Sequence, residues 1–539
     1  MKTIAETIRW LESPQVLKGI FVNVTNVDDG TAVPKNFYFS TISYYNSALS
    51  IEYLPIITNE LVFTESLSIT GDSSISYGSI ELENTAGVYD SWLPYIWYRR
   101  PIEIYLGDPS WSPNDFVLVF KGLVNSLELS SENTLSLSIT NNLENINDTL
   151  HQKTVKDLGN SYSEFQNSAG IDNNTVIPLL FGEAFNISPI LVHNGRQDIT
   201  PAGIAGQFGG TIYKFHDGDF TNGDIIEVRE NGVPLSDIDA SKDAYSESRK
   251  NLAEWEFKIQ VSGTVTCSAR SKSIVDCTVP KIILDILKNY GPDSSKIATA
   301  SINDFSNITN TSKVGVYYPD RVNKLDACNQ IAKSINCNLI HTSITVETSG
   351  TTSEGKFKLI ELKDPSTMSF TTYNSNQYIS STVELNDDSM IEGTFNVSES
   401  FSPKQKIKLA YCKNYTIQEQ IAAGLDPRCK FHEEYWFQEI SSVTATTDPY
   451  ADKNTTEPEN TCLLDTAEAL AEAQKRFALW NKPRYIVSAR YLPRFIFLQL
   501  GDIVSINSQR RFWPANAKAM IFSISRNWVT GLVDIGVLI

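Results

Sequence analysis

The sequence has few of the residues that catalytic and metal sites use most. It contains 5 histidines and 7 cysteines in 539 residues, and no two cysteines have the Cys-x-x-Cys spacing of a structural zinc site. No Gly-x-Ser-x-Gly segment is present to expose a nucleophilic serine. We therefore expect buried free thiols rather than zinc, and we assign no catalytic residue, no cofactor and no metal ligand.

Long apolar runs are also missing. No segment reaches the roughly 18 consecutive apolar residues that cross a bilayer. The first 17 residues lack the apolar run of a signal peptide, because Glu6, Arg9, Glu12 and Pro14 interrupt it. We expect a protein that is synthesised in a cytoplasm and has no membrane span.

Positive charge is scarce as well. The chain has 45 Lys and Arg against 63 Asp and Glu, a formal net charge of −18. Proteins bind a phosphate backbone through Lys and Arg that displace its counterions. We therefore expect no specific binding of nucleic acid.

Alternating apolar and polar residues are abundant near both ends of the chain. They mark strands over residues 75–84, 102–108, 120–124 and 498–506, a hairpin that joins residues 127–129 to 135–139, and a last hairpin that ends at Ile539. A chain of this length exceeds one hydrophobic core. We predict a mainly β, multidomain fold: an N-terminal β-barrel-like domain (1–150), a β-rich connecting domain (151–265), a small α/β insertion (266–390) and a C-terminal β-barrel-like domain with one helix (391–539).

Helical periodicity is confined to short segments. We predict helices over residues 3–12, from Pro280 to about 290, over 321–335 and over 465–480. After the last helix we predict strands over 485–491, 495–506 and 519–528.

An acidic segment suggests two interpretations. Asp217, Asp219, Asp224 and Glu227 offer the clustered oxygens that calcium prefers. However, Asn222 and Val228 stand where an EF-hand needs its glycine and its bidentate acid. We therefore favour a hairpin turn with exposed acids.

Aromatic residues gather between Tyr89 and Trp111. We predict that Trp92, Arg99 and Arg100 contact another subunit, because Trp and Arg are enriched in interface hot spots. The alternative is a sugar-binding platform that includes Trp97 and Trp111.

Several of these segments together resemble tail-tip, or baseplate hub, proteins of bacteriophages with long flexible tails. The resemblance is carried by residues 75–84 and 90–93, 100–108, 120–122, 176–192, 407–416, 498–506 and 524–528. It implies two β-barrel domains in each subunit and a homotrimeric ring that presents six similar barrels to a sixfold tail tube.

The resemblance also implies a location and partners. The protein would be a structural virion component rather than an enzyme. It would line or close the DNA channel until DNA ejection. Its contacts would be the distal tail or tail-tube protein, the tape-measure protein and a central fibre or receptor-binding protein. Two other functions stay open: a carbohydrate-binding adhesin and a peptidoglycan hydrolase.

Overall fold

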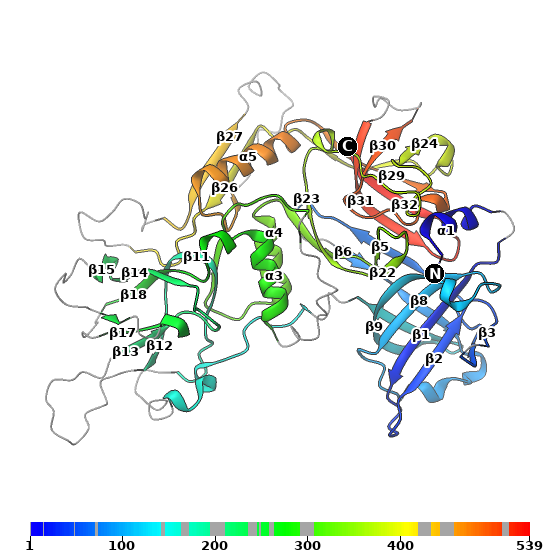
Figure 1. Ribbon diagram of the computed structural model, residues 1–539, viewed down its shortest axis with the longest axis horizontal. Helices are drawn as coiled ribbons and strands as arrows, with labels where there is room; N and C mark the ends of the chain where they lie inside the picture. Colours follow the sequence, from blue (N-terminus) through cyan, green and yellow to red (C-terminus); the bar gives the residue numbers. More distant parts are fainter. Residues whose placement is uncertain are drawn as a thin grey trace.

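Strands dominate the secondary structure, which confirms the predicted mainly β, multidomain fold (Figure 1). The computed structural model describes the following residues, and every structural statement concerns these: 2–13, 16–47, 49–69, 74–141, 146–162, 172–193, 211–235, 245–246, 250–257, 263–291, 305, 307–418, 433–441, 458–508 and 517–539.

The N-terminal sheet has six strands, and a seventh segment closes it. Leu54 N–H donates to Tyr38 O at 3.0 Å on one edge, and Thr58 N–H donates to Glu81 O at 3.0 Å on the other. The segment between these residues therefore joins the two edge strands and completes a barrel. The strand order is β2 (Lys35–Ser40), β1 (Gly19–Val27), β8 (Pro101–Gly107), β9 (Val117–Ser131), β10 (Thr134–Thr140) and β7 (Ser79–Glu83).

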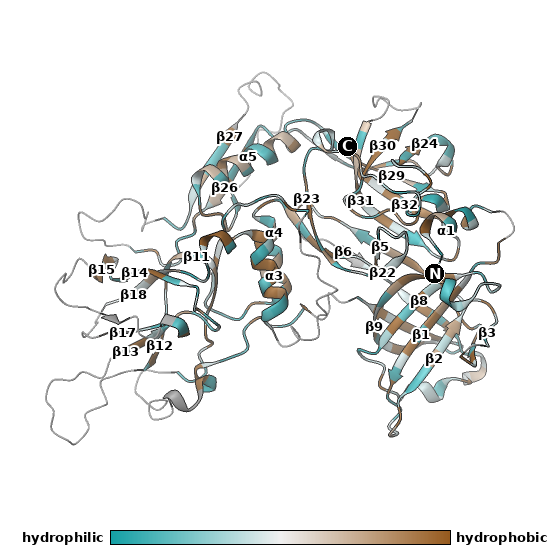
Figure 2. Cartoon of the chain, viewed as in Figure 1, coloured by the Kyte–Doolittle hydropathy of each residue, from teal (hydrophilic) through white to brown (hydrophobic). Residues whose placement is uncertain are grey.

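The barrel strands follow the predicted alternation. Along β10 the residues Leu135, Leu137 and Ile139 are buried, while their neighbours are half-buried. Figure 2 shows the same alternation of brown and teal along β1 and β8. Because successive side chains of a strand point to opposite faces, this pattern fills the barrel with apolar groups and leaves its outside polar.

The C-terminal sheet is built differently, because it takes strands from the N-terminal part of the chain. Its long strand β31 (Ala517–Asn527) pairs with β30 (Ile503–Asn507) over its first part and with β5 (Val62–Ser66) over its second part. The strand β5 in turn pairs with β6 (Ser74–Ser76). The remaining strands are β24 (Glu384–Asn386), β32 (Val533–Leu538), β29 (Arg484–Tyr491) and β25 (Asn396–Phe401).

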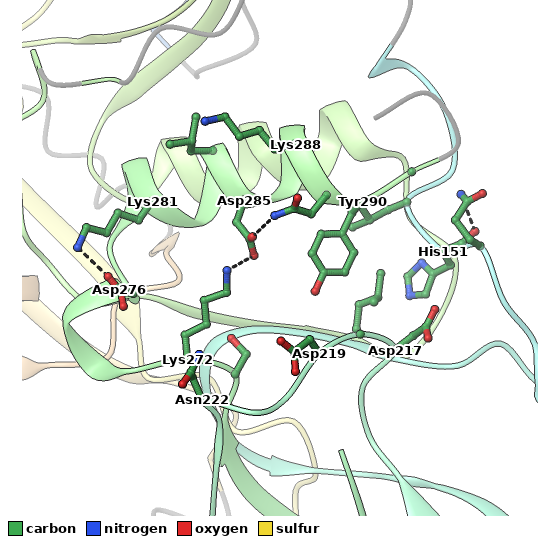
Figure 3. Close-up of a pocket in the computed structure, with 18 of the residues that line it drawn as sticks. His151, Asp217, Asp219, Asn222, Lys272, Asp276, Lys281, Asp285, Lys288 and Tyr290 are labelled. Carbon is green, nitrogen blue, oxygen red and sulfur yellow. Dashed lines mark hydrogen bonds and ion pairs between the residues drawn. The ribbon is translucent and has the colours of Figure 1, made fainter. Parts of the chain in front are cut away.

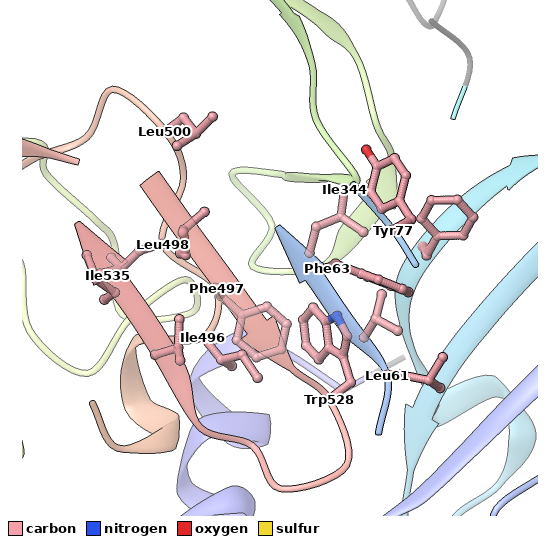
Figure 4. Packing of buried hydrophobic residues seen from close by; sticks show 14 of the residues in the cluster. Leu61, Phe63, Tyr77, Ile344, Ile496, Phe497, Leu498, Leu500, Trp528 and Ile535 are labelled. Carbon is pink, nitrogen blue, oxygen red and sulfur yellow. The ribbon is translucent and has the colours of Figure 1, made fainter. Parts of the chain in front are cut away.

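One hydrophobic core spans the barrel and the C-terminal sheet. Figure 4 shows Phe63 of the borrowed strand β5 and Tyr77, whose ring centroids lie 5.5 Å apart, near Ile344 and Trp528. The N-terminal helix α1 (Ile4–Leu11) belongs to the same core through Ile4, Ile8 and Leu11. Burial of so much shared apolar surface makes the two sheets a single packed unit.

Three further sheets of the described residues form a second lobe, at the left of Figure 1. It has a five-stranded sheet, a four-stranded sheet and a three-stranded sheet. The helix α5 (Thr466–Trp480) covers the three-stranded sheet through Ala473 and Phe477, which pack on Ile407, Leu409 and Ile440.

The elements of this lobe have the following bounds. The five-stranded sheet contains β15 (Val233–Pro234), β14 (Asp224–Glu230), β18 (Val265–Arg270), β11 (Leu179–Ile187) and β19 (Gly315–Tyr318). The four-stranded sheet contains β12 (Ile190–His193), β13 (Thr211–Lys214), β17 (Glu254–Phe257) and β16 (Tyr245–Ser246), and the three-stranded sheet β27 (Trp436–Ser441), β26 (Lys406–Tyr411) and β28 (Glu459–Asn460).

Helices and hairpins lie close to where the sequence predicts them. The predicted helices correspond to α1, α3 (Val279–Asn289), α4 (Lys324–Lys333) and α5. Two small hairpins follow α4, β20 (Cys337–His341) with β23 (Phe357–Glu361) and β21 (Ile344–Val346) with β22 (Thr352–Glu354).

The predicted strand over residues 495–506 is wrong in its first part. A short 3-10 helix spans Pro493–Phe495, turns follow, and the strand begins only at Ile503. The residues Phe495, Ile496, Phe497 and Leu498 are all buried, so their apolar run reflects burial on every side rather than a strand with one apolar face.

The acidic segment forms a turn, but not a hairpin. It connects β13 of the four-stranded sheet to β14 of the five-stranded sheet. The Asp219 carboxylate accepts hydrogen bonds from the N–H and the hydroxyl of Thr221. The turn chemistry was therefore predicted correctly and the pairing of the flanking strands was not.

Candidate functional site

A polar pocket of about 1010 Å³ lies in the second lobe. Helix α3, the turn that contains Asp217 and Asp219, and the segment at His151 form its walls (Figure 3). The side chains labelled in the figure carry charge or hydrogen-bonding groups, and Leu150, Ile177, Leu179 and Leu284 add apolar surface, so the pocket offers contacts to both polar and apolar parts of a ligand.

Most charges in the pocket are compensated within it. Lys272 Nζ lies 2.6 Å from Asp285 Oδ2, and Lys281 Nζ lies 2.8 Å from Asp276 Oδ1. At the other end Lys153 Nζ lies 3.0 Å from Asp217 Oδ1. A balanced set of ion pairs does not generate a strong field of one sign, so the pocket has no marked preference for an anion or a cation.

The buried His216 beneath the pocket is held neutral. Its Nδ1 accepts a hydrogen bond from Leu180 N–H at 3.0 Å, which leaves the proton on Nε2, 3.2 Å from the Tyr290 hydroxyl. Burial lowers the pKa of His216 to about 3, and burial also raises the pKa of Tyr290. Both groups keep their protons fixed near neutral pH and are poorly suited to general acid–base catalysis there.

Metal binding has no support among the residues that the structure describes. No group of three or more His, Cys, Asp and Glu side chains is placed to hold an ion within those ranges. The calcium interpretation of the acidic segment therefore gains nothing from the geometry.

The residues that we predicted as subunit contacts lie together at one end of the barrel. Trp92 is half-buried and stacks on Tyr89 with ring centroids 4.2 Å apart. Arg99 lies over the Tyr98 ring and places Nη2 3.9 Å from Asp148 Oδ2. The Arg100 Nε donates to Ile96 O at 3.1 Å. These internal contacts fix the side chains but do not test whether they also contact another subunit.

The aromatic residues between Tyr89 and Trp111 do not form one platform. Trp97 is only 3% exposed, and its Nε1 donates to Trp92 O at 2.9 Å. Trp111 instead packs on Trp10 of α1, with ring centroids 4.6 Å apart. A buried ring cannot stack on a sugar, so the predicted pair of Trp97 and Trp111 does not make a carbohydrate site.

The pocket was not predicted from the sequence. Its walls come from residues 150–153, 177–179, 217–222 and 271–291, which are distant in the chain. No spacing rule connects such segments. The one available signal was the density of Asp and Gly in residues 217–224, which marks a turn and not its neighbours.

Comparisons with known proteins give distant structural likenesses. No protein-family model and no curated protein matches the chain. A 43 kDa tail protein of a Shewanella oneidensis prophage is 9% identical with a TM-score of 0.35, and covers 97% of this chain and 98% of its own. A tail protein of Neisseria meningitidis is 8% identical with a TM-score of 0.38, and the match covers 92% of this chain and 95% of that protein. A Listeria monocytogenes prophage tail protein is 10% identical with a TM-score of 0.30, and the match covers 96% of this chain and 93% of that protein.

These solved structures are named as tail proteins, the class that the sequence resembles. Their TM-scores lie below 0.5, however, so the likeness does not by itself establish a common fold. Among the described residues, no helix combines the length and the apolarity needed to cross a bilayer.

Proposed function

We propose that the chain is a structural subunit of a bacteriophage tail tip. In this proposal the N-terminal barrel and the C-terminal sheet form the ring, and the ring joins the tail tube to the receptor-binding tip and surrounds the DNA channel. Its partners are further copies of this chain, in a homotrimer, together with the distal tail or tail-tube protein, the tape-measure protein and a central fibre or receptor-binding protein.

The observation that carries the proposal is the shared core of the barrel and the C-terminal sheet. Strand β5 leaves the barrel and completes the other sheet through five register pairs with β31, from Val62 to Ser66. Each copy thus offers two β-sheet units fixed side by side. Three such copies arranged in a closed ring would present six sheet units around one passage.

A buried ion pair that fixes the borrowed strand β5 to β31 within the C-terminal sheet supports a rigid role. Glu65 Oε2 lies 2.8 Å from Arg526 Nη1, and both side chains are 2% exposed. Arg526 also donates to the carbonyl oxygens of Ile496 and Leu498. A ring under load needs fixed angles between its parts, and a fully bonded buried pair resists their relative movement.

The charge of the chain fits a channel through which DNA slides. A net charge of −18 gives few cationic groups to hold phosphates. DNA in such a passage would be repelled from the wall rather than retained.

Labelled virions test the proposal directly. Purified phage particles that carry this chain would be imaged with an antibody to it, and we expect label at the end of the tail distal to the capsid. Label on the capsid, or particles without the chain, would refute the proposal. Glycan binding or release of peptidoglycan fragments by the purified protein would instead favour the adhesin or the hydrolase.

A further inference from the structure

One end of the N-terminal barrel exposes apolar side chains beside two arginines. We call this surface the barrel tip and define it as Val33, Val88, Ile96, Tyr98, Arg99 and Arg100. Val33 is 73% exposed, Ile96 53% and Tyr98 54%. Exposed apolar groups rimmed by Arg are typical of protein contact surfaces rather than of free surface.

The barrel tip is a single surface, although its residues come from two loops. Ile96 N–H donates to Asp28 O at 2.8 Å, which fixes the loop after β7 against the loop that holds Val33. Lys35 Nζ lies 5.1 Å from the centre of the Tyr95 ring and 2.6 Å from Asp29 Oδ2. These contacts hold the apolar groups and Arg100 in one fixed arrangement.

The apolar part of the barrel tip faces away from the rest of the molecule, whereas Arg99 at its rim lies near Asp148, whose carbonyl accepts from Lys324 N–H at the start of α4. The opposite end of the barrel receives α1, where Trp10 Nε1 donates to Asp108 Oδ2. Pairing of Val24 with Ile102 and of Gly19 with Gly107 places the tip at the other end of β1 and β8. In Figure 1 the hairpin of β1 and β2 accordingly points to the bottom of the view.

The C-terminal sheet has a surface of opposite charge at its outer edge. We call it the acidic edge and define it as Asp388, Glu392 and Glu399, with the exposed Val397 between the last two. The segment runs along β29, since Ile391 N–H donates to Arg490 O and Ser398 Oγ donates to Ile486 O. Both arginines of β29 that flank this segment are already paired, Arg490 with Asp534 at 2.9 Å and Arg484 with Asp364 at 2.8 Å.

The acidic edge is suited to side-chain contacts and not to strand addition. Its strand β25 carries a bulge between Val397 and Glu399, and five of its six residues are exposed. A bulge and a charged side chain on an edge strand prevent continuous pairing with another strand. The carboxylates stay available for cations of a partner.

We infer that the barrel tip of one copy docks on the acidic edge of the next copy. The two surfaces cannot meet within one chain, because Figure 1 places the β1–β2 hairpin and strand β29, along which the acidic edge runs, at opposite ends of the lobe. A tip-to-tip contact would place Arg100 against Arg100. Head-to-tail docking instead joins unlike charges, as a heterologous ring requires.

This contact rests on the proposed function, since it names the surface through which the ring closes. With a net charge of −18, two copies repel at long range. Complementary local charges would then select one orientation of approach and one contact.

Charge reversal of the purified full chain tests the inference. Self-association of the unmodified protein is measured by sedimentation over a range of concentrations and salt. We expect Arg100→Glu, and separately the double reversal Glu392→Lys with Glu399→Lys, to raise the dissociation constant by about tenfold or more, because like charges would then face each other. The combined chain with all three substitutions should regain most of the affinity.

The matched control is Lys288→Glu, an exposed cation on α3 in the other lobe, which should leave association unchanged. Circular dichroism and thermal melting confirm that each variant stays folded. Added salt should weaken association of the unmodified protein through screening.

Three results would overturn the inference. The unmodified protein could stay monomeric at its highest soluble concentration and low salt, the charge reversals could weaken self-association no more than the control does, or the chain with all three substitutions could fail to regain affinity. If virions nevertheless carry the chain at the tail tip, the proposed function stands and another surface, or another tail protein at the barrel tip, makes the contact. If virions lack the chain, the proposed function fails whatever the association data show.

Discussion

Loss of one partner of the buried Glu65–Arg526 pair should destabilise the unit formed by the barrel and the C-terminal sheet. In Glu65→Gln the Arg526 guanidinium keeps its bonds to the carbonyls of Ile496 and Leu498, at 2.9 and 2.7 Å, but loses its counter-charge. Removing one partner of a buried ion pair costs about 3–5 kcal/mol, because the other charge stays buried and unpaired.

The expected loss is near the lower end of that range. The glutamine side chain of the variant would keep an oxygen that can accept from Ser343 N–H, the 2.6 Å bond that Glu65 Oε1 now accepts. A loss of about 3 kcal/mol should lower the melting temperature of this unit by roughly 6–12 °C, given about 2–4 °C for each kcal/mol in units of this size.

Differential scanning calorimetry on the full chain measures the effect, with Arg526→Met and the double variant completing a cycle. The double variant should lose less stability than the sum of the single variants, since it leaves no unpaired charge. The control is the pair of Arg490 and Asp534, which has similar geometry at 2.9 Å but side chains that are 48% and 47% exposed. Arg490→Met should cost at most about 1 kcal/mol. Equal effects at the buried and the exposed pair would refute the reasoning.

Three further outcomes follow from the same contacts. Burial alone would raise the pKa of Glu65, but Arg526 and Ser343 lower it below its ordinary value of 4.5. The stability that Glu65 contributes is therefore present above pH 4.5 and is lost as the pH falls through the folded-state pKa. The melting temperatures of wild type and Glu65→Gln should converge in acid. Burial lowers the pKa of His216 from 6.5 to about 3. As the pH falls, the unfolded chain therefore binds a proton at this residue before the folded chain does, and the free energy of unfolding decreases from pH 6.5 towards 3. His216→Asn should flatten this dependence of stability on pH, and an unchanged dependence would contradict a buried, neutral His216. Asp465 caps α5 by accepting from Ala467 N–H at 2.8 Å, so Asp465→Ala should cost about 1 kcal/mol in urea unfolding, whereas Asp465→Asn should cost little.

Local elements could be predicted because their signals are local. The hairpin of β9 and β10 follows from the alternation of Leu135, Leu137 and Ile139, and α5 from its cap at Asp465 and its run of helix formers. The signals for these elements lie within the elements themselves, so periodicity and capping suffice.

The pairing of distant strands could not be predicted in the same way. Strand β5 has ordinary alternation, and nothing in residues 62–66 identifies β31 as its partner strand. The two strands are far apart in the chain, since Glu65 and Arg526 are separated by 461 positions. The same limit applies to the turn at Asp219, whose flanking strands join different sheets. Partner choice depends on how whole sheets bury their faces, which a single stretch of sequence does not encode.

The sequence indicates only part of the candidate surfaces. Tryptophan and arginine content pointed to Trp92, Arg99 and Arg100, and the structure brings them to one end of the barrel. The exposed Val33 comes from another loop, and the pocket near Tyr290 draws on four separated segments. Such sites exist only after folding has brought their parts together.

Electron cryomicroscopy of isolated tail tips that contain the chain tests the central claim most directly. We predict a closed ring of three copies around a central passage, in which the N-terminal barrel and the C-terminal sheet alternate as six β-sheet units. A single copy at the tip, an open helical array, or a ring in which only one of the two sheets lies beside the passage would contradict the account.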